Sequence, residues 1–190
     1  SLFMMFNIKS SYEALLDKDA TANQNILSCR VNSLLIGRNI RDSYLIPDSD
    51  GNERLLQTAE NAQESLLANM ELLKANFPSQ LERSTLDEYI SVTTSWANTN
   101  PQLIDWYRQY AKTGDESYLQ KGIQFISETD TPDQEKMATA ATSLVNYLTQ
   151  GMADERERIQ LEISVIITIV AVATVIATIA VIALAFMIIK

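Results

Sequence analysis

The chain of 190 residues has a net charge of −9, with 24 acidic and 15 basic residues, one cysteine and no histidine. Without histidine it has no His-ligated haem or zinc and no imidazole general base. An acidic surface repels phosphate backbones, so we expect no nucleic-acid partner. The sequence also lacks a glycine-rich phosphate loop and a recognisable catalytic carboxylate pair, so we predict no enzyme, no cofactor and no metal site.

The first quarter of the chain predicts one long helix. Residues 1–7, SLFMMFN, are expected to be the end of a first membrane helix. From about Ile8 to Ile46, apolar residues recur at intervals of three and four, which is typical of an amphipathic helix. Its core face is Ile8, Tyr12, Leu15, Ala22, Ile26, Cys29, Ile36 and Ile40. Because Cys29 lies on this face, we interpret it as a small buried hydrophobe.

Two further helices are predicted before residue 115. Pro47 ends the first helix, and Asp50 is the expected cap of a second, which ends before Pro78. A third begins near Ser79, and Pro101 should bend it because proline interrupts helical hydrogen bonding. The expected core faces are Leu56, Ala59, Leu66, Met70, Leu73 and Phe77 in the second helix, and Leu86, Ile90, Thr93, Trp96, Leu103, Tyr107 and Tyr110 in the third.

The last helix is predicted to begin at TPDQEK, after an ambiguous segment at 115–130. Thr131 suits the cap, Pro132 the first helical position and Gln134 the capping-box partner. Met137, Ala141, Leu144 and Leu148 form its core face. No proline follows, so we expect this helix to continue without interruption into residues 163–189.

Residues 163–189 are 27 consecutive uncharged residues, nearly all Ile, Val, Ala or Leu. About 20 apolar residues suffice to cross a bilayer as a helix, so we predict a transmembrane helix here. Ala173, Thr174, Ala177 and Thr178 place small residues four apart, a weak signal for close helix packing. All the acidic residues and 14 of the 15 basic residues precede the span, giving residues 1–162 a net charge of −10. Only Lys190 follows it, and positive residues favour the cytoplasm, so we place residues 1–162 outside.

These elements predict an all-α fold, an antiparallel up-down-up-down four-helix bundle whose last helix continues into the membrane. The expected domains are residues 1–7, the tail of the first membrane segment; 8–162, the extracytoplasmic bundle; and 163–189, the transmembrane helix.

Arginines of the first helix are the best candidate site. Arg30, Leu34, Arg38, Arg41 and Leu45 follow one another at intervals of 4, 4, 3 and 4 residues, so they form a stripe beside the core face. Arginine binds carboxylates through a rigid fork of donors. The stripe is therefore either a ligand contact or a solvated face on which Asp42, Asp48 or Asp50 pairs with Arg38 and Arg41. The aromatic residues Trp96, Trp106, Tyr107 and Tyr110 are interpreted as core or dimer surface rather than a ligand cage.

Four segments followed by a membrane helix together resemble the four-helix-bundle sensor module of bacterial methyl-accepting chemotaxis receptors. The segments are LSCRVNSLLIGRNIRDSYLIPDSD, LLKANFP, YAKTGD and TPDQEKMATAATSLVNYL. The resemblance covers residues 8–189, and IGRNIRD followed by YLIPD is its most specific part. It implies a homodimer in the bacterial cytoplasmic membrane, with a small-molecule ligand bound at the dimer interface and a signal carried by the last helix. It also implies a cytoplasmic signalling module beyond these residues.

By this resemblance, Arg38 and Arg41, with Arg30, hold a ligand carboxylate, and Thr131 and Gln134 add contacts from the last helix. The arginine spacing differs from that of the amino-acid-sensing members, so the resemblance does not fix the ligand class. Two alternatives remain open at this point. One is the sensor domain of a histidine kinase or cyclase, and the other is a ligand-free module that contacts a periplasmic binding protein.

Overall fold

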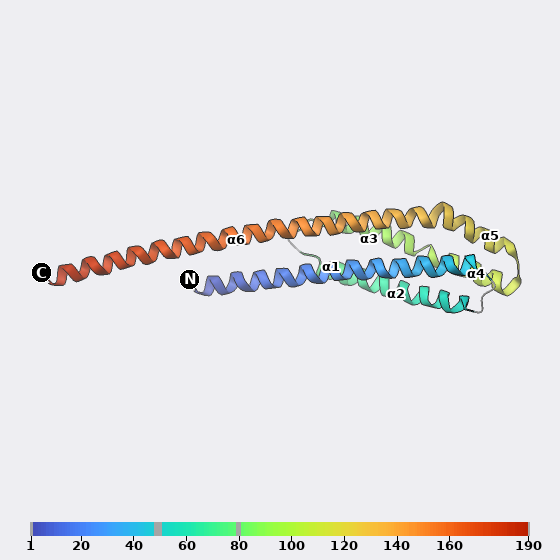
Figure 1. The fold of residues 1–190 in the computed structure, drawn as a ribbon, viewed down its shortest axis with the longest axis horizontal. Coiled ribbons are helices and arrows are strands. Elements are labelled where there is room, and N and C mark those ends of the chain that lie inside the picture. The colour runs from blue at the N-terminus through green and yellow to red at the C-terminus, as the bar shows by residue number, and fades with distance from the viewer. Residues whose placement is uncertain (1, 48–50, 79–80, 190) are drawn as a thin grey trace. The chain divides into compact units, whose positions relative to one another are not determined.

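The protein is helical throughout the part that the computed structural model describes: the backbone of residues 2–47, 51–78 and 81–189, with side chains at 13, 17 and, outside those gaps, 20–184. The helices are α1 (Leu2–Leu45), α2 (Asn52–Asn76), α3 (Ser84–Ala97), α4 (Asn100–Thr113), α5 (Glu116–Phe125), a π-helical turn η1 (Ile126–Asp130) and α6 (Thr131–Ile189) (Figure 1). These ranges contain no strand, which confirms the all-α fold class.

The chain forms two compact parts. Residues 18–149 make up one, and residues 1–17 together with 150–190 make up the other. The larger part contains most of α1, all of α2 to α5, η1 and the beginning of α6. It therefore holds every candidate site residue.

The part formed by residues 18–149 contains a hydrophobic core made of side chains from α1, α2, α3, α4 and α6. Trp96, Tyr89, Leu66 and Leu144 are among its fully buried members. The predicted core faces are confirmed wherever side chains are described, with Ile90 and Tyr110 only half-buried. Ile8, Tyr12 and Leu15 lie outside the described side chains. Fully burying each large apolar side chain contributes about 1.5–3 kcal/mol, so this shared core is what holds the helices side by side.

The helix ends follow the prolines. α1 ends at Leu45, shortly before Pro47. Phe77 is extended, at ψ 133°, because the residue before a proline avoids the helical conformation, and α2 therefore ends at Asn76. Gly51 precedes α2 as its cap position, whereas the expected cap Asp50 and the expected helix start Ser79 lie outside the described residues.

The predicted interruption near Pro101 is confirmed. α3 ends at Ala97 and α4 begins at Asn100, with Pro101 in the first turn of α4. Proline is tolerated there because its missing N–H has no intrahelical acceptor.

The predicted cap at Thr131 is wrong, because Thr131 is itself helical, at φ −64° and ψ −48°. Asp115 caps instead: its carboxylate accepts a hydrogen bond of 2.9 Å from the Ser117 N–H. The helical backbone then passes through α5 and η1 directly into α6. The Thr131 N–H donates to the Ile126 carbonyl, five residues back. This wider turn precedes Pro132, whose ring would crowd an ordinary α-helical turn.

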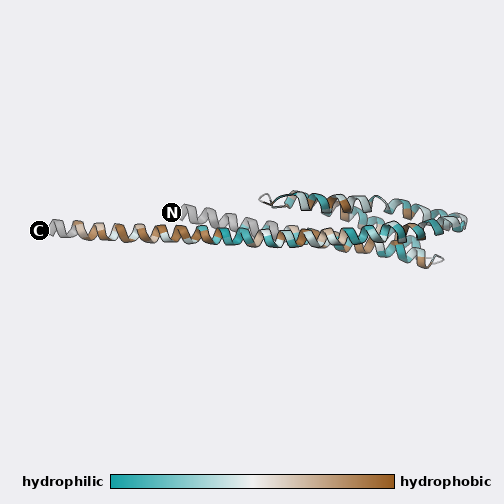
Figure 2. Ribbon diagram, turned by 90° about the horizontal axis from the view of Figure 1, so that it is seen from above, coloured by the Kyte–Doolittle hydropathy of each residue, from teal (hydrophilic) through white to brown (hydrophobic). Residues whose placement is uncertain are grey.

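α6 is helical from Thr131 to Ile189, including the whole stretch between Met137 and Val165. Among the described residues, one helical run, Glu116–Leu184, contains a stretch long and apolar enough to cross a membrane. That stretch is not buried by other parts of the protein. It appears as the brown end of α6 in Figure 2.

Candidate ligand-binding site

A cavity of about 310 Å³ lies among α1, α3 and α6 within residues 18–149. α1 lines it with Arg30, Ser33, Leu34 and Arg41, and α3 with Tyr89. α6 supplies the remaining lining residues: Thr131, Gln134, Glu135, Met137, Ala138 and Ala141. Four of the five residues selected from the sequence, Arg30, Arg41, Thr131 and Gln134, thus line one cavity, although about 100 residues separate the two groups along the chain.

Helical periodicity explains which arginines of α1 meet. Arg30 and Arg41 are 11 residues apart, about three turns, so they point in nearly the same direction. Arg38 does not line the cavity. Its side chain is 77% exposed, and its Nε lies 3.4 Å from the Asp42 carboxylate. Arg38 therefore lies on a solvated face of α1 and pairs with Asp42, which was one of the two alternatives considered from the sequence.

The two cavity arginines differ in their surroundings. Arg41 is half-buried, and its Nε donates a hydrogen bond of 2.9 Å to the Gly37 carbonyl. The nearby carboxyl of Asp130 also attracts it. Arg30 is exposed and forms no ion pair with any described residue. Arg30 is therefore the cavity cation whose charge is least compensated.

The end of the Gln134 side chain lies directly against Gly37 of α1. A Cβ added to Gly37 would lie 1.8 Å from the Gln134 amide nitrogen. That nitrogen is buried, and no described residue accepts a hydrogen bond from it. An unpaired buried donor costs about 1–3 kcal/mol, so a ligand atom that accepts from this amide would recover that free energy.

Asp130 lies immediately before the α6 residues of the cavity and is only 2% exposed. Its Oδ1 accepts a hydrogen bond of 2.6 Å from the indole Nε1 of the fully buried Trp96. Burial raises the pKa of the Asp130 carboxyl, and the hydrogen bond from Trp96 and the charge of Arg41 partly oppose that rise. Asp130 is thus a buried acid that links α3 to the π-helical turn beside the cavity.

Sequence reasoning missed Ser33, Tyr89 and Glu135 as lining residues, and it missed Asp130. Tyr89 falls outside the core face expected for its helix, and Glu135 reads as a residue that favours a helix N-terminus. Asp130 directly precedes the candidate residue Thr131, and this position is the signal in the sequence that could have identified Asp130 as a residue near the site. The aromatic prediction holds for Trp96 and Tyr107, which are buried core residues.

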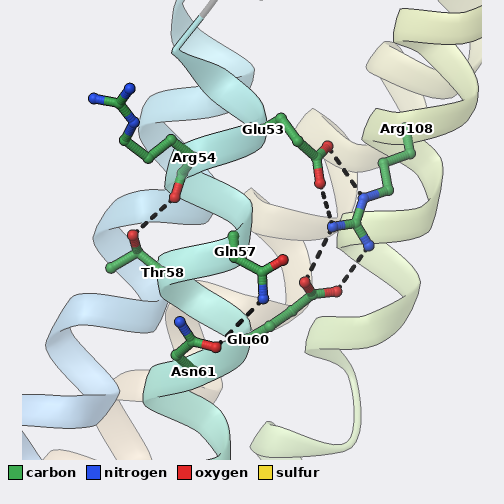
Figure 3. A network of polar contacts seen from close by, with 7 residues as sticks. All are labelled: Glu53, Arg54, Gln57, Thr58, Glu60, Asn61 and Arg108. Atoms are coloured by element: carbon green, nitrogen blue, oxygen red, sulfur yellow. Dashed lines mark hydrogen bonds and ion pairs between the residues drawn. The ribbon is translucent and has the colours of Figure 1, made fainter.

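An ion-pair network outside the cavity connects α2 and α4. Arg108 donates to Glu53 at 2.6 Å and to Glu60 at 2.7 Å (Figure 3). These hydrogen bonds raise the pKa of the Arg108 guanidinium, so the arginine stays charged. Because one guanidinium pairs with both carboxylates, the network connects α2 to α4. Among the described residues, no group of His, Cys, Asp or Glu is arranged to hold a metal ion.

Cys29 is buried in the core, as expected from its place on the α1 face. Burial raises the pKa of its thiol to about 11, so it remains a neutral thiol at physiological pH. This agrees with its interpretation as a small apolar side chain.

Comparison of the chain with protein families, curated proteins and solved structures finds no match.

Proposed function

We propose that the protein is the sensor module of a transmembrane receptor that binds a small organic anion in the cavity among α1, α3 and α6. The observation that carries this proposal is the cavity itself. It gathers two arginines of α1 and the amide of Gln134 on α6, whose nitrogen has no acceptor among the described residues. Guanidinium and amide groups are the donors that bind carboxylates in proteins.

The helices are proposed to form an antiparallel up-down-up-down bundle outside the membrane, as in the chemotaxis receptors that the sequence resembles. In this proposal α6 crosses the membrane, with residues 1–162 extracytoplasmic. A ligand that touches both α1 and α6 favours one arrangement of these helices. Coupling is limited to the difference in ligand affinity between the two arrangements, typically about 1–3 kcal/mol.

A homodimer formed through α1 is part of the same proposal. Leu27, Val31, Leu34 and Leu45 are exposed, and their spacing places them on one face of α1 together with Arg38. A contiguous apolar face in water marks an interaction surface. Arg30 and Leu34 also line the cavity, so a second copy on this face would border the ligand site.

Calorimetry with the full chain in detergent tests the binding proposal. Arg30→Gln combined with Arg41→Gln should reduce the affinity for an organic acid at least tenfold, because hydrogen bonds to charged groups contribute about 1.5–3 kcal/mol each. Arg54→Gln is the control, since it removes an exposed arginine of α2 that lines neither the cavity nor the proposed dimer face. Equal affinity in the double variant and the control would refute the site.

A further inference from the structure

We infer that the cavity selects organic acids with a single carboxylate and an apolar body, and that Glu135 rejects dicarboxylates. This inference rests on the proposed function, because it names the class of ligand that the proposed site binds. It is argued from the charges, the donors and the apolar side chains that line the cavity.

The ionised side chains that line the cavity carry a net charge of +1, because Arg30 and Arg41 contribute two positive charges and Glu135 one negative charge. Arg41 is already attracted by the buried carboxyl of Asp130, whereas Arg30 forms no ion pair among the described residues. Inside a partly enclosed cavity, charges are screened less than in bulk water, so such differences affect binding strongly. A single carboxylate matches the uncompensated charge of Arg30.

Glu135 disfavours a second negative charge on the ligand. It lines the same cavity from α6, and its carboxylate forms no ion pair with a described residue. The neighbouring Lys136 pairs instead with Asp133, at 2.8 Å. A second ligand carboxylate would lie in a small cavity with Glu135 and experience like-charge repulsion, so dicarboxylates should bind poorly.

Apolar side chains form the remaining wall. Leu34 of α1 faces water over much of its surface, and Met137, Ala138 and Ala141 of α6 line the same cavity. A volume of about 310 Å³ lies at the small end of ligand pockets. A short hydrocarbon or aromatic body would cover these side chains and remove apolar surface from water.

Gln134 adds a donor without adding charge. Its amide nitrogen is buried beside Gly37 without a partner in the described part of the chain. The last torsion of glutamine is broad, so rotation about it turns the nitrogen toward the cavity. A carboxylate oxygen would supply the acceptor that this donor lacks among the described residues.

Three probes built on the 3-phenylpropanoyl unit test the inference in calorimetry on the full chain in detergent. The probes are 3-phenylpropionate, its neutral amide, and 2-phenylsuccinate, which adds a carboxylate. We expect 3-phenylpropionate to bind at least tenfold more tightly than each of the other two. Arg30→Gln should abolish the advantage over the amide, and Arg54→Gln, which changes an exposed arginine of α2 outside the cavity, should leave all three affinities unchanged.

Glu135→Gln is the decisive variant. It should raise the affinity for 2-phenylsuccinate about fivefold or more while changing that for 3-phenylpropionate less, because the variant removes only the repulsion. Glu135 is on the surface, so this substitution preserves the fold, and circular dichroism checks that it does.

Two results would separate the possible failures. If 2-phenylsuccinate bound as tightly as 3-phenylpropionate, the inferred ligand class would be wrong, while the cavity would remain an anion site. If none of the three bound at millimolar concentration, or if Arg30→Gln changed no affinity, both the ligand class and the proposed function would be refuted.

Discussion

The carboxyl of Asp130 couples stability to pH. Burial raises its pKa above the ordinary value of 3.8, so over a range above pH 3.8 the folded protein holds a proton that the unfolded chain has released. The free energy of unfolding therefore falls as pH rises through this range. Asp130→Asn cannot ionise, yet its amide oxygen still accepts from Trp96.

Asp130→Asn should consequently melt at a higher temperature than the wild type near neutral pH, and the difference should shrink toward pH 3.8. Thermal melts followed by circular dichroism over a series of pH values measure this. Asp130→Ala is the control, because it removes the charge together with the acceptor. It leaves the Trp96 N–H unpaired, at a cost of about 1–3 kcal/mol. A wild-type pH dependence in Asp130→Asn would contradict the role assigned to this acid.

Gly37 and Gln134 should be coupled in both stability and binding. In a helix interior, Gly→Ala ordinarily stabilises by about 1 kcal/mol. Here the new Cβ would occupy the place of the Gln134 amide. Gly37→Ala alone should therefore stabilise the protein little and weaken binding of an organic acid, because the displaced amide loses its position in the cavity.

A double-mutant cycle with Gln134→Ala isolates this contact. In the Gln134→Ala background the remaining close neighbour of the new Cβ is the end of the flexible Arg41 side chain, at 3.1 Å, so Gly37→Ala should recover most of its stabilisation of about 1 kcal/mol. Urea unfolding measures the four free energies, and calorimetry measures the affinities. Purely additive effects would mean that the two side chains do not meet.

How much of the site was predictable depended on helical geometry. The spacing of Arg30 and Arg41 showed that one helix face carries both, and this is a local property of sequence. Arg38 belongs to the same stripe in sequence, yet it turns to water, because the stripe is wider than the part that α6 covers. Tyr89 and Asp130 lie near the site because helices that are distant in sequence pack together. A local sequence pattern does not predict such packing.

At the scale of the helix, Gly122 allows α5 to approach the ring of Tyr44 on α1 closely. A Cβ at this position would lie 2.0 Å from the ring of Tyr44, which is buried and donates a 2.6 Å hydrogen bond to the Leu103 carbonyl. An aromatic ring fixed in this way cannot yield as a flexible side chain does. Gly122→Ala should therefore destabilise the protein by about 1–3 kcal/mol, despite the better helix propensity of alanine.

Chemical denaturation measures this loss, and Gln120→Ala, on the exposed surface of the same helix, is the control and should change stability by less than about 0.5 kcal/mol. The additional substitution Tyr44→Phe does not relieve the contact, since the ring itself collides. A Gly122→Ala variant as stable as the control would show that Gly122 does not lie against the ring of Tyr44.

The helices themselves were largely predictable, because apolar periodicity and proline positions are local signals. Pro47, Pro78 and Pro101 each lie where a helix ends or restarts. The segment 115–130 was not predictable, since TPDQEK has every feature of a helix start. The chain instead continues through a π-helical turn, supported by the buried contact of Asp130 with Trp96, which acts across α3 and η1. A tertiary contact thus overrides a local capping signal.

At the scale of the whole molecule, the decisive question is whether α6 enters a bilayer. The side chains of Val175 and Ile179, near the middle of residues 163–189, are exposed, which costs free energy in water and none in hydrocarbon. An arginine at the centre of a membrane helix costs about 2.5–3.5 kcal/mol on insertion scales. Val175→Arg combined with Ile179→Arg should therefore oppose insertion by about 5–7 kcal/mol.

The measurement is alkaline carbonate extraction of bacterial membranes that contain the full chain. The wild-type chain should remain in the membrane pellet, and the double-arginine variant should appear largely in the supernatant or be degraded. Gln150→Arg with Ala153→Arg adds the same charge to exposed positions of α6 before the span, and it should remain in the pellet. Because the two variants differ only in where the charge lies along α6, equal extraction of both would contradict a transmembrane role for residues 163–189.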